Sequence, residues 1–193
     1  SALITGIAAV HYYYMRDYWL ATESSPTFFR YVDWILTVPL MCVEFYLLTK
    51  LAGAKKSLLW KLIIASTWML VCGYIGEAFS DGTTAHSVTW GVLSTFGYLY
   101  IVYTVWFGEV AVLAEKSNSE TIKKGVRYLA WFVLVGWAIY PVGYMCMDGG
   151  WLSDIMSPNS IDVWYNIADA INKIGFGLVV YSIAISETKK ELV

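Results

Sequence analysis

Six apolar stretches, each close to the length of a membrane-spanning helix, limit what this chain can fold into. They occupy residues 1–19, 28–48, 58–79, 86–108, 126–147 and 161–186. A helix needs about 20 mainly apolar residues to cross the hydrocarbon core of a bilayer. Polar connections separate the stretches, and 58% of all residues are hydrophobic, whereas soluble domains usually have about 45–50%. The sequence therefore predicts a single all-α transmembrane domain over residues 1–193, surrounded by membrane lipid.

Lys and Arg residues are concentrated on one side of the predicted bundle. Ten of the thirteen follow the second, fourth or sixth stretch: Lys50, Lys55, Lys56, Lys61, Lys116, Lys123, Lys124, Arg127, Lys189 and Lys190. The other side has only Arg16 and Arg30. Because loops rich in Lys and Arg tend to stay in the cytoplasm, we expect a cytoplasmic C-terminus. The second and sixth stretches then run from the outside to the inside.

Charge and cysteine content argue against several other classes of protein. The net charge of −2 gives no reason to expect nucleic acid as a partner. The three cysteines, Cys42, Cys72 and Cys146, lie in apolar stretches and have neither a paired pattern nor the spacing of a metal site. We therefore expect buried, unreactive thiols and no bound metal.

Four ionisable residues lie within the predicted spans, where charge is costly and usually functional. Asp33 and Glu44 are in the second stretch, and Asp169 and Lys173 are in the sixth. Lys173 lies twelve residues after Ile161, or about 18 Å along a helix, near the middle of the bilayer. It could form a structural ion pair with Asp169, one helical turn earlier. It could equally bind an aldehyde covalently in an apolar pocket, and its position alone leaves both interpretations open.

Asp33 and Glu44 share one face of their predicted helix. They are eleven residues apart, which places them about 16 Å apart along the axis, with Thr37 between them. A central Lys173 would then have one carboxylate on each side, an arrangement that suits directional proton transfer. Both acids could instead pair with cations, but only Asp33 has one within reach in its own span, namely Arg30.

Aromatic residues are abundant, with ten Trp and fifteen Tyr. Some belong to the belts at the membrane interfaces. Trp34, Trp137 and Tyr140 instead lie inside predicted spans, beside the charged positions or Pro141. Such rings could enclose a flat apolar cofactor, although each ring taken alone is also explained by packing.

Four motifs, in order along the chain, resemble the microbial rhodopsins. Residues 30–40 (RYVDWILTVPL) resemble the third helix of that family, residues 136–144 (GWAIYPVGY) the sixth, and residues 169–173 (DAINK) the seventh. Residues 73–77 (GYIGE) resemble the fourth helix of the proteorhodopsins in particular. The resemblance covers nearly the whole chain.

Microbial rhodopsins are bundles of seven helices, so the resemblance implies that the six predicted spans are helices B to G of such a bundle. The first helix, which carries neither the retinal lysine nor a main proton carrier, is absent from this sequence. The resemblance further implies that Lys173 binds all-trans retinal through a protonated Schiff base.

The resemblance also implies a role for the other polar residues. Asp33 would be the primary proton acceptor and counterion, Asp169 the second counterion, and Glu44 the proton donor on the cytoplasmic side. Arg30 would complete the counterion complex, and His11 would pair with Asp33.

The resemblance implies a retinal pocket and a second pigment site. The pocket residues would be Trp34, Thr37, Met41, Met69, Trp137, Tyr140 and Pro141. Met41 occupies the position at which this family tunes colour, and an apolar residue there implies absorption of green light. Gly91, beside Trp90, matches a glycine that carotenoid-binding relatives have next to the retinal ring, which implies a carotenoid antenna. The alternative is that Gly91 only permits close packing of helices.

The function that the resemblance implies is outward proton transport driven by light, which is not an enzymatic reaction. The main alternative is a photosensor that signals to a partner protein, and a rhodopsin-like scaffold without a chromophore is a third. Glu44 favours the pump, because sensors of this family usually lack a carboxylate there. Pumps for chloride or sodium replace members of the set Asp33, Thr37 and Glu44, all of which are kept here. Lateral association into a homo-oligomer is common in the family and is expected.

Overall fold

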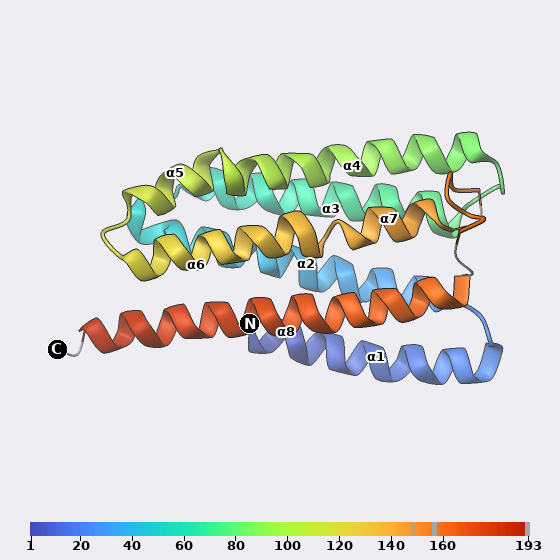
Figure 1. Ribbon diagram of the computed structural model, residues 1–193, viewed down its shortest axis with the longest axis horizontal. Coiled ribbons are helices and arrows are strands. Elements are labelled where there is room, and N and C mark those ends of the chain that lie inside the picture. Colours follow the sequence, from blue (N-terminus) through green and yellow to red (C-terminus); the bar gives the residue numbers. More distant parts are fainter. Residues whose placement is uncertain (148, 156–157, 192–193) are drawn as a thin grey trace.

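The computed structural model describes residues 1–147, 149–155 and 158–191, and within these ranges it contains helices and no strands. The elements are α1 (Ala2–Thr22), α2 (Thr27–Thr49), η1 (Lys50–Ala52), α3 (Lys56–Ala78), α4 (Thr84–Trp106), α5 (Glu109–Lys116), α6 (Glu120–Trp131), η2 (Phe132–Gly136), α7 (Ile139–Met145) and α8 (Pro158–Glu191). They form six roughly parallel rods, because α5 follows α4 after a short break and α6, η2 and α7 follow one another in one rod (Figure 1). The prediction of an all-helical bundle is confirmed.

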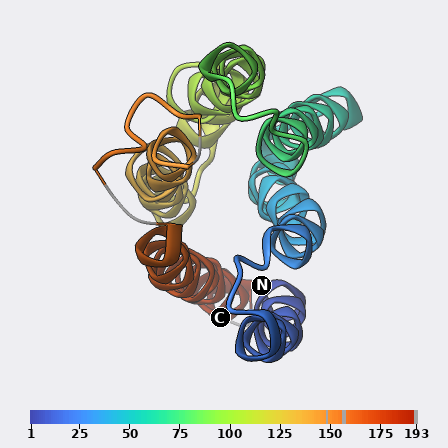
Figure 2. The same cartoon turned by 90° about the vertical axis from the view of Figure 1, so that its right-hand side faces the viewer.

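The six rods are arranged in a ring. Viewed from one end, the chain passes from α1 through α2, α3 and α4 to the α6–α7 rod, and α8 then lies beside α1 (Figure 2). Each rod contacts the next one, and α8 contacts α1, α6 and α7. Residues far apart in the sequence, on α1, α2, α7 and α8, therefore face one another across the inside of the ring.

Five of the described helical segments are long and apolar enough to cross a membrane. They correspond to the second through sixth predicted spans. α1 has a comparable length of 21 residues, but polar residues such as Tyr12, Arg16 and Asp17 reduce its apolar character. The outer surface of the bundle carries many exposed apolar side chains, among them Leu47, Ile64, Phe96 and Leu178, as expected for a surface in contact with lipid.

The predicted span 126–147 is not one regular helix. α6 ends at Trp131, η2 is a π-helical turn, and α7 begins only at Ile139. A backbone irregularity inside a membrane requires other groups to bond the carbonyls that it frees. The Tyr98 hydroxyl on α4 donates to the carbonyls of Val133 and Leu134 at 3.1 and 2.8 Å. The sequence did not indicate this turn, because its residues Phe132 to Gly136 continue the apolar pattern without interruption.

Candidate functional site

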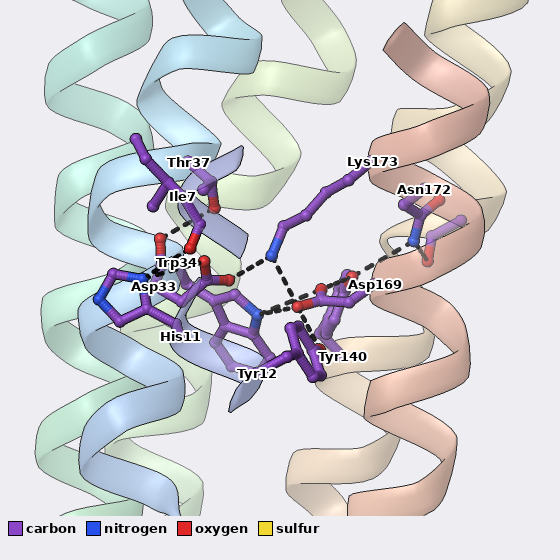
Figure 3. A network of polar contacts seen from close by, with 11 residues as sticks. Ile7, His11, Tyr12, Asp33, Trp34, Thr37, Tyr140, Asp169, Asn172 and Lys173 are labelled. Carbon is purple, nitrogen blue, oxygen red and sulfur yellow. Dashed lines mark hydrogen bonds and ion pairs between the residues drawn. The ribbon is translucent and has the colours of Figure 1, made fainter. Parts of the chain in front are cut away.

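Lys173 lies between two carboxylates inside the bundle, and all three side chains are buried. Its Nζ donates to Asp169 Oδ2 at 2.7 Å and forms a second ion pair with Asp33 Oδ2. Lys173 and Asp169 are one turn apart on α8, and Asp33 reaches them from α2 (Figure 3). The contact predicted between Lys173 and Asp169 is present, and Asp33 joins it from another helix.

The two carboxylates receive different numbers of hydrogen bonds. Asp169 also accepts from the Tyr12 hydroxyl at 2.6 Å, the Trp34 indole nitrogen at 3.1 Å and the Tyr140 hydroxyl at 2.5 Å. Among the residues that the structure describes, Asp33 has Lys173 as its one side-chain donor, and its Oδ1 has no hydrogen-bond partner. Because each donor stabilises the ionised form of a carboxylate, Asp169 is the better stabilised anion of the pair.

His11 and Thr37 lie beside Asp33 without donating to its carboxylate. His11 Nδ1 is 3.8 Å from Asp33 Oδ1 and donates to the Ile7 carbonyl at 2.9 Å. Thr37 Oγ1 donates to the main-chain carbonyl of Asp33 at 2.9 Å. His11 thus has the predicted position next to Asp33, at a distance longer than a hydrogen bond.

An apolar cavity of about 420 Å³ adjoins this charged group. Its volume lies within the range of about 300–1,000 Å³ that is usual for small-molecule sites. Trp34 and Tyr140 belong both to the cavity wall and to the hydrogen bonds around Asp169, so the cavity ends against the charged group. Aromatic rings line the cavity, so a flat apolar molecule fits it. An end group of that molecule that reacts with an amine would be near Lys173, and Asp33 Oδ1, which has no hydrogen-bond partner among the described residues, could accept a hydrogen bond there.

Five of the seven predicted pocket residues line the cavity: Trp34, Met69, Trp137, Tyr140 and Pro141. The other two, Thr37 and Met41, are buried but are not on its wall. Thr37 points to the Asp33 carbonyl, and Met41 packs within the main hydrophobic core. Lys173 is not on the wall either, because its amine is held by the two carboxylates.

Asn172 links the charged group to the irregular part of the α6–α7 rod. Its Nδ2 donates to the Gly136 carbonyl at 3.0 Å and to the Tyr140 hydroxyl at 3.3 Å. A Cβ at position 136 would lie 1.9 Å from Asn172 Oδ1, so only glycine permits this approach. The end of the π-helical turn is thereby fixed against α8.

Arg30 forms a second buried group near the first residues of α2 and α8 and the last residues of α3. We call this end of the bundle the outer end and the opposite, Lys-rich end the inner end. The Nη2 of Arg30 donates to Asp162 Oδ1 at 2.5 Å, and its Nη1 lies 3.8 Å from Glu77 Oε1. Among the described residues, no ion pair joins Arg30 to Asp33 or Asp169. The structure thus places the guanidinium of Arg30, which was predicted to complete the counterion complex, beside Asp162 and Glu77 and not in direct contact with the carboxylates around Lys173.

Hydroxyl groups complete the outer cluster, which we define as Arg30, Glu77 and Asp162 with their donors. Glu77 accepts from the Thr27 and Tyr31 hydroxyls at 3.0 and 3.1 Å, and Asp162 accepts from Ser25 at 2.8 Å. The outer half of the bundle thus contains a buried polar cluster beside the smaller hydrophobic core around Tyr31, Ile161 and Tyr165.

In the inner half, the charged side chain buried among the described residues is Glu44 on α2, whereas Thr49, Ser66 and Thr104 donate their hydroxyls to main-chain carbonyls of their own helices. The Oε1 of Glu44 accepts from the Ser1 hydroxyl at 2.6 Å and forms an ion pair with the Ser1 amino group at 2.5 Å, and its Oε2 has no hydrogen-bond partner among the described residues. The rings of Phe45 and Phe176 pack edge to face, with centroids 5.6 Å apart, in the same core as Met41. Glu44 is thus separated from Lys173 by apolar side chains.

Gly91 lines the cavity, but the space above it is filled. A Cβ at this position would lie 2.8 Å from the ring of Tyr144, whose hydroxyl donates to the Ser87 carbonyl at 2.8 Å. The opening predicted at Gly91 is therefore covered by Tyr144 in this structure, and room for a carotenoid ring would require that side chain to turn away.

Sequence reasoning did not single out Tyr12, Asn172 or Asp162 as site residues. Tyr12 follows His11 in a predicted span, and this pair of polar residues was a usable signal. Asp162 is the second residue of the predicted span 161–186, and the motif at residues 73–77 contains Glu77 without a role. Their partners lie on other helices, so spacing along one helix could not reveal them.

Comparisons with known proteins agree with this geometry. A family described as bacteriorhodopsin-like protein matches residues 1–187. The green-light absorbing proteorhodopsin of Gamma-proteobacterium EBAC31A08 is 41% identical over 192 residues, which cover 97% of this chain and 73% of that protein. The crystal structure of blue light-absorbing proteorhodopsin from Med12 is 38% identical with a TM-score of 0.77, over 96% of this chain and 80% of that one. The structure of xanthorhodopsin, a light-driven ion pump with dual chromophore, is 28% identical with a TM-score of 0.81, and the match covers 98% of this chain and 79% of that one.

Replacing Arg30 by Gln tests whether the outer cluster stabilises the fold. The change leaves two buried carboxylates without their cation, which costs about 3–5 kcal/mol for a buried ion pair that loses one partner. Thermal unfolding in detergent, followed by circular dichroism, should show a clearly lower Tm. Arg16→Gln is the matched control, because Arg16 pairs with Asp17 on the surface and such pairs contribute little. Equal Tm values for both variants would contradict a stabilising role of the cluster.

Proposed function

Because this chain belongs to the bacteriorhodopsin-like family, the microbial rhodopsins, and is an integral multi-pass membrane protein, we propose that it pumps protons outward in response to light. One observation carries the proposal. The Lys173 amine lies between two carboxylates that accept different numbers of hydrogen bonds. The outer cluster lies on one side of this group, and the apolar core that contains Phe45 and Phe176 lies on the other, toward Glu44. A proton that leaves this nitrogen therefore has the charged groups of the outer cluster in the outward direction, whereas Phe45 and Phe176 belong to the packed core in the inward direction.

The family implies a retinal chromophore, which would supply light absorption when bound to Lys173 as a Schiff base. The residues that would hold it are the cavity residues Trp34, Met69, Trp137, Tyr140 and Pro141. Their aromatic rings exclude water from the nitrogen, which strengthens the electrostatic attraction between Lys173 and its carboxylates.

Asp33 is proposed as the acceptor of the proton that leaves Lys173. The N–H bond at Nζ breaks and an O–H bond forms on Asp33, so one positive and one negative charge disappear together. Asp169 is the less suitable acceptor because Tyr12, Trp34 and Tyr140 already stabilise its anion. Asp169 then keeps its negative charge as the second counterion. His11, whose Nδ1 lies 3.8 Å from Asp33 Oδ1, is close enough to form a hydrogen bond with Asp33 after a small movement once Asp33 is protonated.

Glu44 is proposed as the donor that returns a proton to Lys173. It lies on the same face of α2 as Asp33, about 16 Å along the axis, and one of its oxygens has no hydrogen-bond partner among the described residues. Buried Met41, Phe45 and Phe176 keep water away from this half, so the donor is reached only when these side chains move. This separation of acceptor from donor gives the transport its direction.

The orientation of the bundle follows from the same proposal. The Lys-rich ends of the helices, including the C-terminal end of α8, would face the cytoplasm. Transport from Glu44 toward Asp33 and the outer cluster is then outward. Assembly into a homo-oligomer stays a prediction from the family resemblance.

A photosensor is the alternative function. Both functions require the charged group around Lys173, so the group does not distinguish them. A buried Glu44 at the apolar end favours the pump, because a carboxylate with one unpartnered oxygen is costly to bury and has a use as a proton donor.

The proposal as a whole is tested by illuminating vesicles that contain the protein and recording the external pH. Light should produce a pH change that a protonophore abolishes. Lys173→Ala should remove both this change and the visible absorption, because the aldehyde then has no amine to bind. A protein that absorbs light but gives no pH change would favour the photosensor, and visible absorption retained by Lys173→Ala would refute the assignment of the lysine.

Replacing each of the two proposed proton carriers, Asp33 and Glu44, by its amide should impair a different step of proton transfer. Glu44→Gln should slow the return of a proton to Lys173 by at least tenfold, with little change in its loss, and azide should partly restore the rate. Asp33→Asn should block the loss itself and abolish pumping. Flash spectroscopy separates the two steps. If Glu44→Gln returns the proton at the parent rate, the donor is another group.

A carotenoid antenna is a further proposal, motivated by Gly91 on the cavity wall. With a hydroxylated carotenoid added, the action spectrum for pumping should gain the blue bands of the carotenoid. Gly91→Trp should remove this gain, because its side chain would occupy the room that Tyr144 has to vacate for a carotenoid ring. An action spectrum that follows retinal absorption alone would reject the antenna.

A further inference from the structure

The apolar cavity extends from the inside of the bundle to its lipid-facing surface. The α4 residues on its wall include Ser94 and Tyr98, which bond to neighbouring helices inside the ring. They also include Val92, Phe96 and Leu99, which are among the exposed apolar residues of the protein. With 100° of rotation per residue, this set runs from the inner face of α4, past the side next to α7, to the outer face. The cavity therefore opens toward lipid between α4 and α7.

Tyr144 on α7 crosses this gap. Its ring lies against Gly91, its hydroxyl donates to the Ser87 carbonyl on α4, and a Cβ on Gly76 of α3 would overlap its oxygen. Two glycines thus provide the room in which this side chain lies. The bond between Tyr144 and Ser87 joins α7 to α4 at the cavity, and it has to break before the two helices can separate there.

Two routes into the cavity along the bundle axis, within the described residues, pass packed groups. Toward the outside, the buried ion pairs of the outer cluster join α2, α3 and α8. Toward the inside, Phe45 and Phe176 belong to the packed core. An apolar molecule dissolved in the bilayer meets neither obstacle when it approaches between α4 and α7.

We infer that retinal enters its site sideways from the bilayer, between α4 and α7, and that the hydrogen bond of Tyr144 to Ser87 limits how far these two helices separate to admit it. The inference rests on the proposed binding of retinal at Lys173. Retinal is apolar and concentrates in lipid, so a lateral path spares it any passage through water. The path ends at Trp34 and Tyr140, whose polar groups bond Asp169 next to the Lys173 amine.

The experiment follows the uptake of retinal in the dark. All-trans retinal is added to retinal-free protein in phosphatidylcholine vesicles, and the rise in visible absorption is recorded. The absorption of each sample is divided by its final value, and the time course then gives the rate constant of uptake. Val92→Trp narrows the opening and should slow uptake at least tenfold. Val71→Trp is the matched control, because Val71 on α3 is 45% exposed, Val92 is 46% exposed, and Val71 does not line the cavity. Its uptake should proceed at the parent rate.

Tyr144→Phe provides an independent readout on the same path. It keeps the ring on Gly91 but removes the hydrogen bond to Ser87, so α4 and α7 separate more readily and uptake should be severalfold faster. Equal rates for Val92→Trp and Val71→Trp would overturn the lateral path. If Val92→Trp does not fold, an unchanged rate in Tyr144→Phe overturns it instead.

These results are separable from the test of the pump. Uptake is measured without light and without a proton gradient. A protein that takes up retinal with the expected sensitivity to Val92→Trp but moves no protons contradicts only the proposed pump. If the protein pumps protons but Val92→Trp and Tyr144→Phe take up retinal at the parent rate, only the lateral path is contradicted.

Discussion

The ion pairs of Lys173 with Asp33 and Asp169 are the constraint on which the rest of the structure depends. A single charge in the interior of a membrane bundle is strongly unfavourable, so the cation has to meet its carboxylates wherever it lies. Asp169 is on the same helix, but Asp33 and the donor Tyr12 come from α2 and α1. Satisfying this one group therefore brings three helices together at the level of Lys173, and Tyr140 adds the α6–α7 rod.

The interior differs on the two sides of this charged group, and the proposed transport depends on this asymmetry. On one side, Arg30 holds Glu77 and Asp162 together with several hydroxyl donors. On the other, Phe45 and Phe176 separate Lys173 from Glu44. A symmetrical arrangement would let a proton return the way it left. The unequal hydrogen bonding of Asp33 and Asp169 adds a second asymmetry, because only one of them remains poorly stabilised as an anion.

Room for a ligand depends on the irregular α6–α7 rod. A regular helix from Glu120 to Met145 would bond its own carbonyls, whereas the π-helical turn leaves Val133, Leu134 and Gly136 to accept from Tyr98 and Asn172. These bonds fix the rod to α4 on one side and to α8 on the other. The aromatic side chains that follow the turn, Trp137 and Tyr140, then line the cavity.

The sequence by itself determined the class of fold and the main residues of the site. The lengths of the apolar stretches set the bundle, and charges inside them are rare enough that Asp33, Glu44, Asp169 and Lys173 could be named without coordinates. Of the seven pocket residues that were predicted, five line the cavity, and three of these, Trp34, Trp137 and Tyr140, stood out as aromatic residues inside the spans. Only the tertiary structure decided which groups meet across helices. The partners of Arg30, the donors to Asp169 and the cover over Gly91 come from helices distant in sequence, and their contacts depend on rotation about each helix axis, which periodicity along a single helix does not specify.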